Sequence, residues 1–204
     1  MRWAPDTRSR LERAALELFS EQGYTATTVP QITARAGLTT RTFFRYFADK
    51  REVLFGGSEV PDMAAALIRE APPELRPMDV IRHVLHQVAA ARFDGQRERT
   101  AAWRRIINAN DSLRDRDARK RADLVLSART AFVERGESPL SATLHAEVGA
   151  LVFHVALEEW LTEPEPRPMA ETVDDVLTRI DVTIAADESR DVPPGDPVTA
   201  SDRP

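Results

Sequence analysis

The sequence predicts an all-α protein, with a small N-terminal domain of three helices followed by a larger helical bundle. Of its 204 residues 42% are hydrophobic, enough to bury a core in each of two domains. Apolar residues recur at helical spacing along nearly the whole chain. The segments between them are short and rich in proline, glycine or polar residues, as in APPELRP, FDGQ, NANDS, GESP and EPEPRP.

The first predicted helix covers residues 7 to 22. Its apolar side chains follow the i, i+3, i+4, i+7, i+8 pattern of a helix with one buried face. Gly23 is placed to end it as a C-cap residue. The residues of the buried face are Leu11, Ala14, Ala15, Leu18 and Phe19.

The second predicted helix runs from about residue 29 to 36. Thr28 followed three residues later by Gln31 is a capping-box pattern, and Pro30 falls in the first turn, where its missing N–H costs nothing. Gly37 then permits a sharp corner, which Leu38 can fill.

The third predicted helix is capped by Thr39 or Thr40 and ends near Phe47. Asp49 and Glu52 form another capping pair and predict the start of a fourth helix. Two short helices joined by a glycine-containing turn form a helix-turn-helix, whose second helix is sized to enter the major groove of DNA.

The third helix carries the side-chain types that bind DNA. Phe43, at i, and Phe47, at i+4, are expected in the core, which leaves the other residues on the more exposed surface. Hydroxyl and guanidinium groups bind base edges and phosphates. Lys50 is expected to form a phosphate-binding site together with the free backbone N–H groups at the start of the next helix. The exposed set is Thr40, Arg41, Thr42, Phe44, Arg45 and Tyr46.

Charge supports this interpretation. The net charge is −5, but up to Gly57 nine basic residues face six acidic ones, giving +3 for this segment and −8 for the remainder. A basic head on an acidic body is typical of a small module that meets phosphate. Two alternatives stay open: Arg41 and Arg45 could be solvated surface charges, and Arg8 and Arg10 could either touch phosphates or form a mobile basic arm.

The segment SRLERAALELFSEQGYTATTVPQITARAGLTTRTFFRYFADKREVLF resembles the DNA-binding domain of the TetR family of bacterial transcription regulators over about 47 residues. The variant TRTFFRYF is similar to an actinobacterial group that includes regulators of mycofactocin-type gene clusters. The sequence departs from the common pattern at Arg41, often glycine, and at Phe44, often a tyrosine whose hydroxyl binds phosphate. Landmarks in register are Ala14, Leu18, Phe19, Gly23, Thr27, Thr28, Ile32, Ala36, Gly37, Thr42, Tyr46, Phe47 and Lys50.

The resemblance implies a ligand-responsive transcriptional regulator, most simply a repressor that a small molecule releases from a palindromic operator. It also implies a homodimer that places two recognition helices in successive major grooves. The DNA-contacting positions carry over onto Thr28, Thr40, Arg41, Thr42, Phe44, Arg45, Tyr46 and Lys50.

The rest of the chain predicts a helical bundle with a division into residues 1–57, 58–186 and a disordered tail, 187–204. Apolar residues occupy more than one face of the segment SATLHAEVGALVFHVALEEW, so it must be buried on more than one side. By the resemblance, one face fills the core and another pairs, with the last helix, across a dimer axis. The body helices are expected at 60–70, 78–92, 97–109, 112–136, 140–161 and 169–186.

A ligand pocket inside the bundle is implied by the resemblance alone. Its candidate lining residues are aromatic or polar, and any one of them is more readily explained as core or interface than as a ligand contact. Arg104 and Arg105 beside Trp103 also suggest an acidic ligand such as an acyl thioester of coenzyme A, although arginine runs are usually solvated. The candidates are His83, Gln87, Phe93, Trp103, Ile107, Phe132, Phe153 and His154.

Other classes of protein are disfavoured. The chain has no cysteine, which excludes disulfides, thiolate zinc sites and cysteine nucleophiles, and His83 with His86 lacks a further ligand in register. We find no nucleophile elbow, phosphate-binding glycine loop or HExxH, so neither an enzyme nor a cofactor is expected. The longest uncharged apolar run, Val148 to Leu157, is short for a membrane span, which favours a cytoplasmic protein. Non-specific DNA binding, a protein-interaction bundle and a ligand-dependent activator stay open as alternatives.

Overall fold

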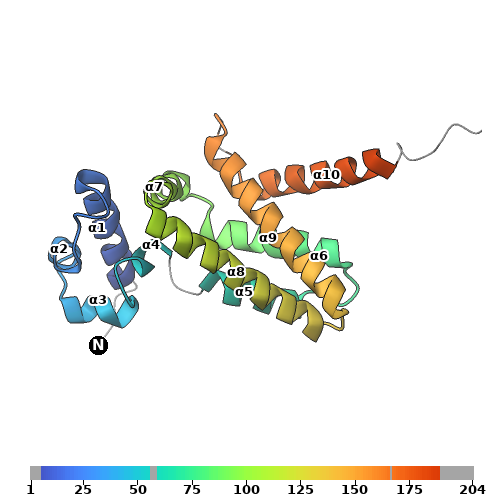
Figure 1. Ribbon diagram of the computed structural model, residues 1–204, viewed down its shortest axis with the longest axis horizontal. Coiled ribbons are helices and arrows are strands. Elements are labelled where there is room, and N and C mark those ends of the chain that lie inside the picture. The colour runs from blue at the N-terminus through green and yellow to red at the C-terminus, as the bar shows by residue number, and fades with distance from the viewer. Residues whose placement is uncertain (1–5, 56–58, 166, 189–204) are drawn as a thin grey trace, which may run out of the picture.

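The computed structural model describes residues 6–55, 59–165 and 167–188. Within these ranges the chain forms helices and no strands, as predicted (Figure 1). The helices are α1 (Asp6–Gln22), α2 (Val29–Arg35), α3 (Thr40–Tyr46), α4 (Glu52–Phe55), α5 (Glu59–Glu70), α6 (Pro77–Arg92), α7 (Arg97–Asn108), α8 (Asp111–Glu134), α9 (Pro139–Thr162) and α10 (Met169–Glu188).

The head, which we define as α1 to α4, is built around one apolar cluster. Leu11 and Phe19 of α1 meet Ile32 of α2 and Phe43 of α3, all of which are almost completely buried. Phe47 joins them with its ring centroid 5.3 Å from that of Phe43. The predicted buried faces of α1 and α3 are therefore confirmed.

The predicted helix ends agree with the local chemistry. Gly23 adopts a φ of 84° and Gly37 a φ of 64°, a region of backbone conformation in which side chains are strained. The Thr28 hydroxyl and the Gln31 side chain form the predicted capping box. Thr39, not Thr40, caps α3 by accepting a hydrogen bond from the Thr42 amide at 3.2 Å.

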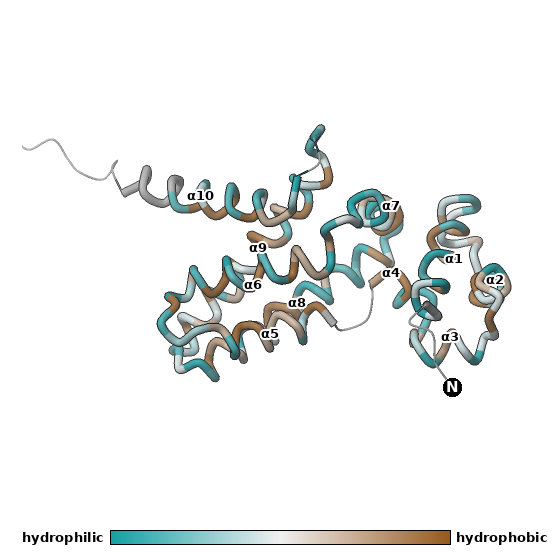
Figure 2. The backbone as a smooth tube through the Cα atoms, turned by 180° about the vertical axis from the view of Figure 1, so that it is seen from behind, coloured by the Kyte–Doolittle hydropathy of each residue, from teal (hydrophilic) through white to brown (hydrophobic). Residues whose placement is uncertain are grey.

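The body, α5 to α10, has a second core of its own. In Figure 1 α8 lies beside α5 and α9, α10 lies on the side of α9 away from the head, and α6 passes behind α9 and packs on α5, α9 and α10. Hydrophobic and hydrophilic residues alternate along these helices (Figure 2), as expected where each buries one stripe. Phe132, Val152 and Val173 are fully buried in this core.

α7 and the beginning of α8 belong to the core of the head, although they follow it by about fifty residues in the sequence. Trp103, Ile107 and Leu113 are in the same apolar cluster as Leu11 and Phe43, and Leu113 is 0% exposed. The head is therefore completed by the body. The domain boundary at residue 57 stays a prediction. The apolar core of the head does not stop at this boundary, because it includes side chains of α7 and α8.

α9 is buried on one face and open on another. Ala142, Ala146 and Ala150 are buried against the bundle, whereas Leu144 is 57% exposed and Leu151 is 44% exposed. By length and composition α9 is the one described helix that could cross a membrane. Its contacts with α6, α7, α8 and α10 instead make it the central helix of the body.

The last helix packs in the core of its own subunit and extends slightly further than expected. Val173, Val176 and Leu177 are buried there because α10 packs on both α6 and α9, and the pairing of α10 with α9 across a dimer axis stays a prediction. The tail was expected to begin at residue 187, but α10 extends to Glu188. The remainder of the predicted tail lies outside the described residues.

Candidate DNA-binding helix and ligand cavity

The corner between α2 and α3 is fixed by a cation from α1. Arg10 donates a hydrogen bond from Nη2 to the Ala36 carbonyl oxygen at 2.6 Å, at the end of α2. A Cβ at Gly37 would lie 3.2 Å from the same nitrogen, so glycine is needed here both for its φ and for the close approach. Arg10 lies inside α1 and holds the corner, so the mobile basic arm, one of the two alternatives left open, does not apply to this residue.

α3 presents one polar face outward. Thr40, Arg41 and Arg45 are exposed, while Phe43 on the opposite face is 0% exposed. Arg41 has no hydrogen-bond or ion-pair partner among the described residues, so its guanidinium keeps all five donors available. The guanidinium of Arg45 lies 5.0 Å from the centroid of the Tyr46 ring.

The remaining residues of the predicted set are more constrained. Phe44 is 54% exposed and packs edge-on to Phe43, so it offers an apolar surface and no hydrogen bond. Thr42 is half-buried, and its hydroxyl lies 3.0 Å from that of Thr39. The Thr28 hydroxyl is exposed but already belongs to the capping box.

Lys50 has a structural role that the sequence does not reveal. Its ammonium group donates to the carbonyl oxygens of Tyr24 and Thr27, both at 2.7 Å, and lies 4.2 Å from the Tyr24 ring centroid. Burial lowers the pKa of this amine. The prediction of free N–H groups beside it is wrong, because Asp49 Oδ1 accepts from two of them, at 2.7 and 3.2 Å.

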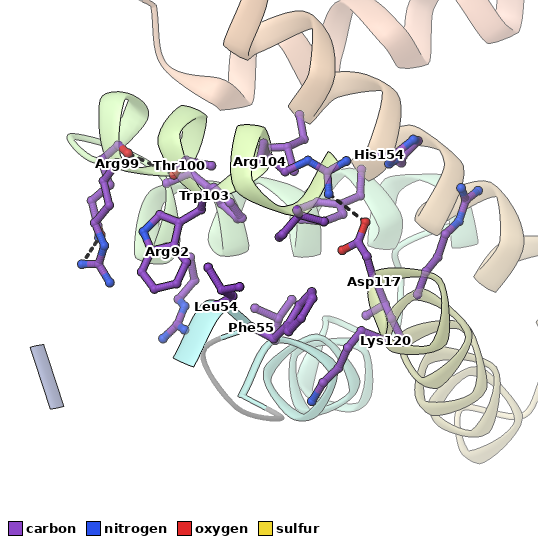
Figure 3. Close-up of a pocket in the computed structure, with 18 of the residues that line it drawn as sticks. Leu54, Phe55, Arg92, Arg99, Thr100, Trp103, Arg104, Asp117, Lys120 and His154 are labelled. Atoms are coloured by element: carbon purple, nitrogen blue, oxygen red, sulfur yellow. Dashed lines mark hydrogen bonds and ion pairs between the residues drawn. The ribbon is translucent and has the colours of Figure 1, made fainter. Parts of the chain in front are cut away.

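A cavity of about 790 Å³ lies where the head meets the body, between α1, α4, α7, α8 and α9. Figure 3 shows Leu54, Phe55 and Trp103 near its middle, with Arg104 joined to Asp117 at one side. Of the predicted pocket residues it is lined by Phe93, Trp103, Ile107, Phe153 and His154.

The other three predicted pocket residues lie elsewhere. Phe132 lines a narrow apolar slot of about 40 Å³ deeper in the body, together with Phe153. His83 and Gln87 line neither the cavity nor the slot. Gln87 is exposed, so it does not lean inward as expected, whereas His83 is half-buried on the same helix.

Two largely buried carboxylates tie the head to the body. Glu12 was not singled out from the sequence, and Glu52 was expected only as a capping residue. Glu12 of α1, with a side chain 11% exposed, pairs with Arg8 and with Arg99 of α7. Glu52 of α4, with a side chain 13% exposed, pairs with Arg116 and with Lys120 of α8. The spacing of Arg116 and Lys120, i and i+4 on α8, was a detectable signal that both face the same side.

Arg104 of α7 lines the cavity and links α7 to α8 and α9. Its guanidinium, 13% exposed, donates to Asp117 at 2.8 Å and to Glu158 of α9. Burial works to lower its pKa, but the two carboxylates outweigh burial and the pKa is raised. Arg104 therefore stays charged although its side chain is largely buried. Within the described chain no group of three or more acidic or histidine side chains could hold a metal.

Comparisons with known proteins agree with the fold. Residues 12–55 match the family model described as bacterial regulatory proteins, tetR family. The chain is 39% identical over 93 residues to the HTH-type transcriptional regulator TcmR of Streptomyces glaucescens, covering 45% of this chain and 41% of TcmR. It is 29% identical over 102 residues to AcrR of Shigella flexneri, covering 47% and 46% of the two chains.

A solved structure extends the similarity to the body. The SmeT–triclosan complex superposes with a TM-score of 0.58 at 20% identity, over 96% of this chain and 99% of that one. Because identity is low, this likeness concerns the fold. The chain spans about two fifths of the length of TcmR. The matched sequence and the helix-turn-helix geometry identify the head as the DNA-binding domain of the tetR family of bacterial regulatory proteins, and the body shares its architecture with a solved structure.

Proposed function

We propose that the protein is a transcriptional regulator that binds a palindromic operator as a homodimer in the cytoplasm and is released from it by a small molecule. The observation that carries this proposal is the outward face of α3, on which Arg41 is exposed and unpartnered beside Thr40 and Arg45. An arginine guanidinium on a recognition helix can donate two hydrogen bonds to the O6 and N7 acceptors of guanine in the major groove. The relatives reported above bear the names of transcriptional regulators.

The surface of α9 supports a dimer. Leu140, Leu144 and Leu151 lie along one side of this helix and are 71%, 57% and 44% exposed. Three exposed leucines on one face of a helix form an apolar surface, which is better explained by contact with a second subunit than by exposure to solvent. We expect Leu144→Arg to give a monomer in sedimentation velocity, whereas Gln87→Arg, on the exposed side of α6, leaves the dimer intact. An unchanged dimer in Leu144→Arg would contradict this interface.

Release by a ligand is supported by where the cavity lies. α1 and α4 of the head and α7 and α8 of the body all contribute to its wall, so any occupant touches both parts. A ligand that prefers a head–body arrangement unsuited to the operator weakens operator binding, typically about 5- to 150-fold. Bound operator weakens binding of the ligand by the same factor. The same linkage permits an activator if the ligand prefers the operator-binding arrangement.

The test is binding to the protein's own promoter region, by gel shift and footprinting in ~150 mM salt, a concentration at which phosphate contacts are partly screened. A protected palindrome, preferred by a factor of ~10³ or more over random DNA, is the expected result. Arg41→Ala should cost about 1–3 kcal/mol on that site and relax its sequence preference. Arg45→Ala tests the neighbouring position.

Arg119→Ala is the matched control, because Arg119 of α8 is exposed and unpartnered among the described residues but lies on the body. It should bind the operator as the wild type does. Binding without a preferred site would instead support the non-specific alternative. Equal losses in Arg41→Ala and Arg119→Ala would remove the assignment of α3 as the reading helix.

A further inference from the structure

The wall of the head–body cavity is rich in positive charge, although the protein as a whole carries a net charge of −5. Concave surfaces of one sign concentrate counter-ions, so this cavity should attract anions. Two of the cations, Arg8 and Arg99, come from opposite sides of the head–body seam. Its cationic lining residues are Arg8, Arg92, Arg99, Arg104, Arg114, Lys120 and Arg121, against the acidic Glu12 and Asp117.

Some of this charge is available to a ligand. Arg121 is exposed and has no hydrogen-bond or ion-pair partner among the described residues. Lys120, one residue earlier on α8, reaches Glu52 only at 3.5 Å, longer than a well-formed charged hydrogen bond. An incoming carboxylate or phosphate could therefore bind Arg121 outright and compete with Glu52 for Lys120.

The cavity adjoins the apolar slot. Val60, Leu124, Ala150 and Phe153 line both, so only these side chains separate the two spaces. Beyond them the slot is lined almost entirely by hydrocarbon side chains of α5, α6, α8 and α9. A charged chamber with an apolar slot beside it matches a molecule with an acidic group at one end and a hydrocarbon tail at the other.

We propose that this site binds an amphiphilic anion, with its carboxylate or phosphate among the cations of α7 and α8, its hydrocarbon tail along the cavity and only the end of that tail in the slot. The regulatory consequence rests on the proposed function, but binding itself does not. Competition for Lys120 would weaken its link to Glu52, which joins α8 of the body to α4 of the head. Occupancy would thus change how firmly the head is held.

The role of charge is tested by isothermal titration of the full chain with dodecanoate below its critical micelle concentration. Dodecanol, with the same tail and no charge, should bind at least about ten-fold more weakly, and Arg121→Glu should weaken dodecanoate binding about ten-fold. Arg119→Glu is the matched control, being an equally exposed arginine of α8 that does not line the cavity. Equal binding of dodecanol, or equal losses in both variants, would overturn the proposal.

The role of the slot is tested by Gly149→Ala. Gly149 lines the slot, and a Cβ there meets the Ile81 side chain at 3.7 Å, an ordinary contact, so the variant should fold. Excluding one or two methylene groups should weaken dodecanoate about four- to fifteen-fold and leave octanoate unchanged. An unchanged affinity for dodecanoate would show that the tail lies elsewhere and would refute the proposed pose.

Two further measurements separate the possible failures. Dodecanoate and dodecanoyl-coenzyme A distinguish a free acid from a phosphate-bearing thioester, and binding of either supports the proposed chemistry. Operator binding is measured without ligand in parallel. A protein that binds operator but neither anion refutes this inference and keeps the proposed function, whereas one that binds the anion but no operator does the reverse.

Discussion

The joint between head and body can be tested with a single side chain. Leu113, at the start of α8, is 0% exposed and packs in the core of the head. Leu113→Ala removes its branched end from a filled site, which costs about 2–5 kcal/mol in comparable cores. Because domains of this size are stable by only about 5–15 kcal/mol, the loss is a large part of the total.

The matched control is Leu126→Ala on the same helix. Leu126 is 59% exposed, so the same chemical change should cost about 0.5 kcal/mol or less. Urea unfolding would be followed by circular dichroism at 222 nm and by the fluorescence of Trp103, which is 8% exposed and lies in the same cluster. Both alanine variants and their reference would carry phenylalanine at the other two tryptophan positions, Trp3 and Trp160, so that the emission reports on Trp103 alone.

The expected result is a lower urea midpoint for Leu113→Ala by both probes, together with weaker operator binding, because a loosened head is no longer held at one spacing. If the two alanine variants unfold at the same midpoint, the start of α8 is not part of the head's core. If Leu113→Ala loses stability but its Trp103 signal keeps the wild-type midpoint, the loss lies in the body, and the joint is not what this side chain supports.

Three further predictions concern local supports. Gly37→Ala should cost about 1–2 kcal/mol at its φ of 64°, and weaken operator binding, because α3 starts from this corner. Gly95→Ala is the control, with a φ of 72° and open space around the new Cβ, so it should lose stability through backbone strain alone and bind the operator as the wild type does. Equal losses of operator affinity in the two variants would contradict the prediction. Arg97→Met removes donors to carbonyl oxygens at the end of α9, one at 2.9 Å, and should lower stability by about 1.5–3 kcal/mol in urea, with no loss if these bonds are unimportant. Hydrogen bonds from the Arg51 side chain lower the pKa of Asp49, so the stability lost in Asp49→Asn should be seen at pH 7 and should vanish as the pH falls below ~4, through the lowered pKa. A difference in melting temperature between Asp49→Asn and the wild type that does not change with pH would argue against this ion pair.

Local rules were sufficient for the helices of this chain. The first helix, expected at 7 to 22, spans Asp6–Gln22, and the capping box at Thr28 and Gln31 forms as written in the sequence. These features depend on residues within a few positions of one another. Periodicity also identified Phe43 as core and left Arg41 on the surface, because one helix face decides both.

Contacts between distant segments were not readable in the same way. Lys50 carries a charge that suits phosphate, but two carbonyl oxygens 23 and 26 residues earlier accept its hydrogen bonds. Trp103 was expected to line a ligand pocket; it lines the head–body cavity and also completes the core of the head. Nothing in the spacing of α7 shows which domain it packs against, so this double role required the structure.

The shared core has a practical consequence for building hybrid regulators. A designer who joins this head to another body at residue 57 would leave behind Trp103, Ile107 and Leu113, and the transplanted head would carry an unfilled hole. A foreign body must supply side chains of matching volume at those places, or the graft must take α7 and the first turn of α8 along with it. Compatibility between heads and bodies in such hybrids would then be set at this joint and not by the linker.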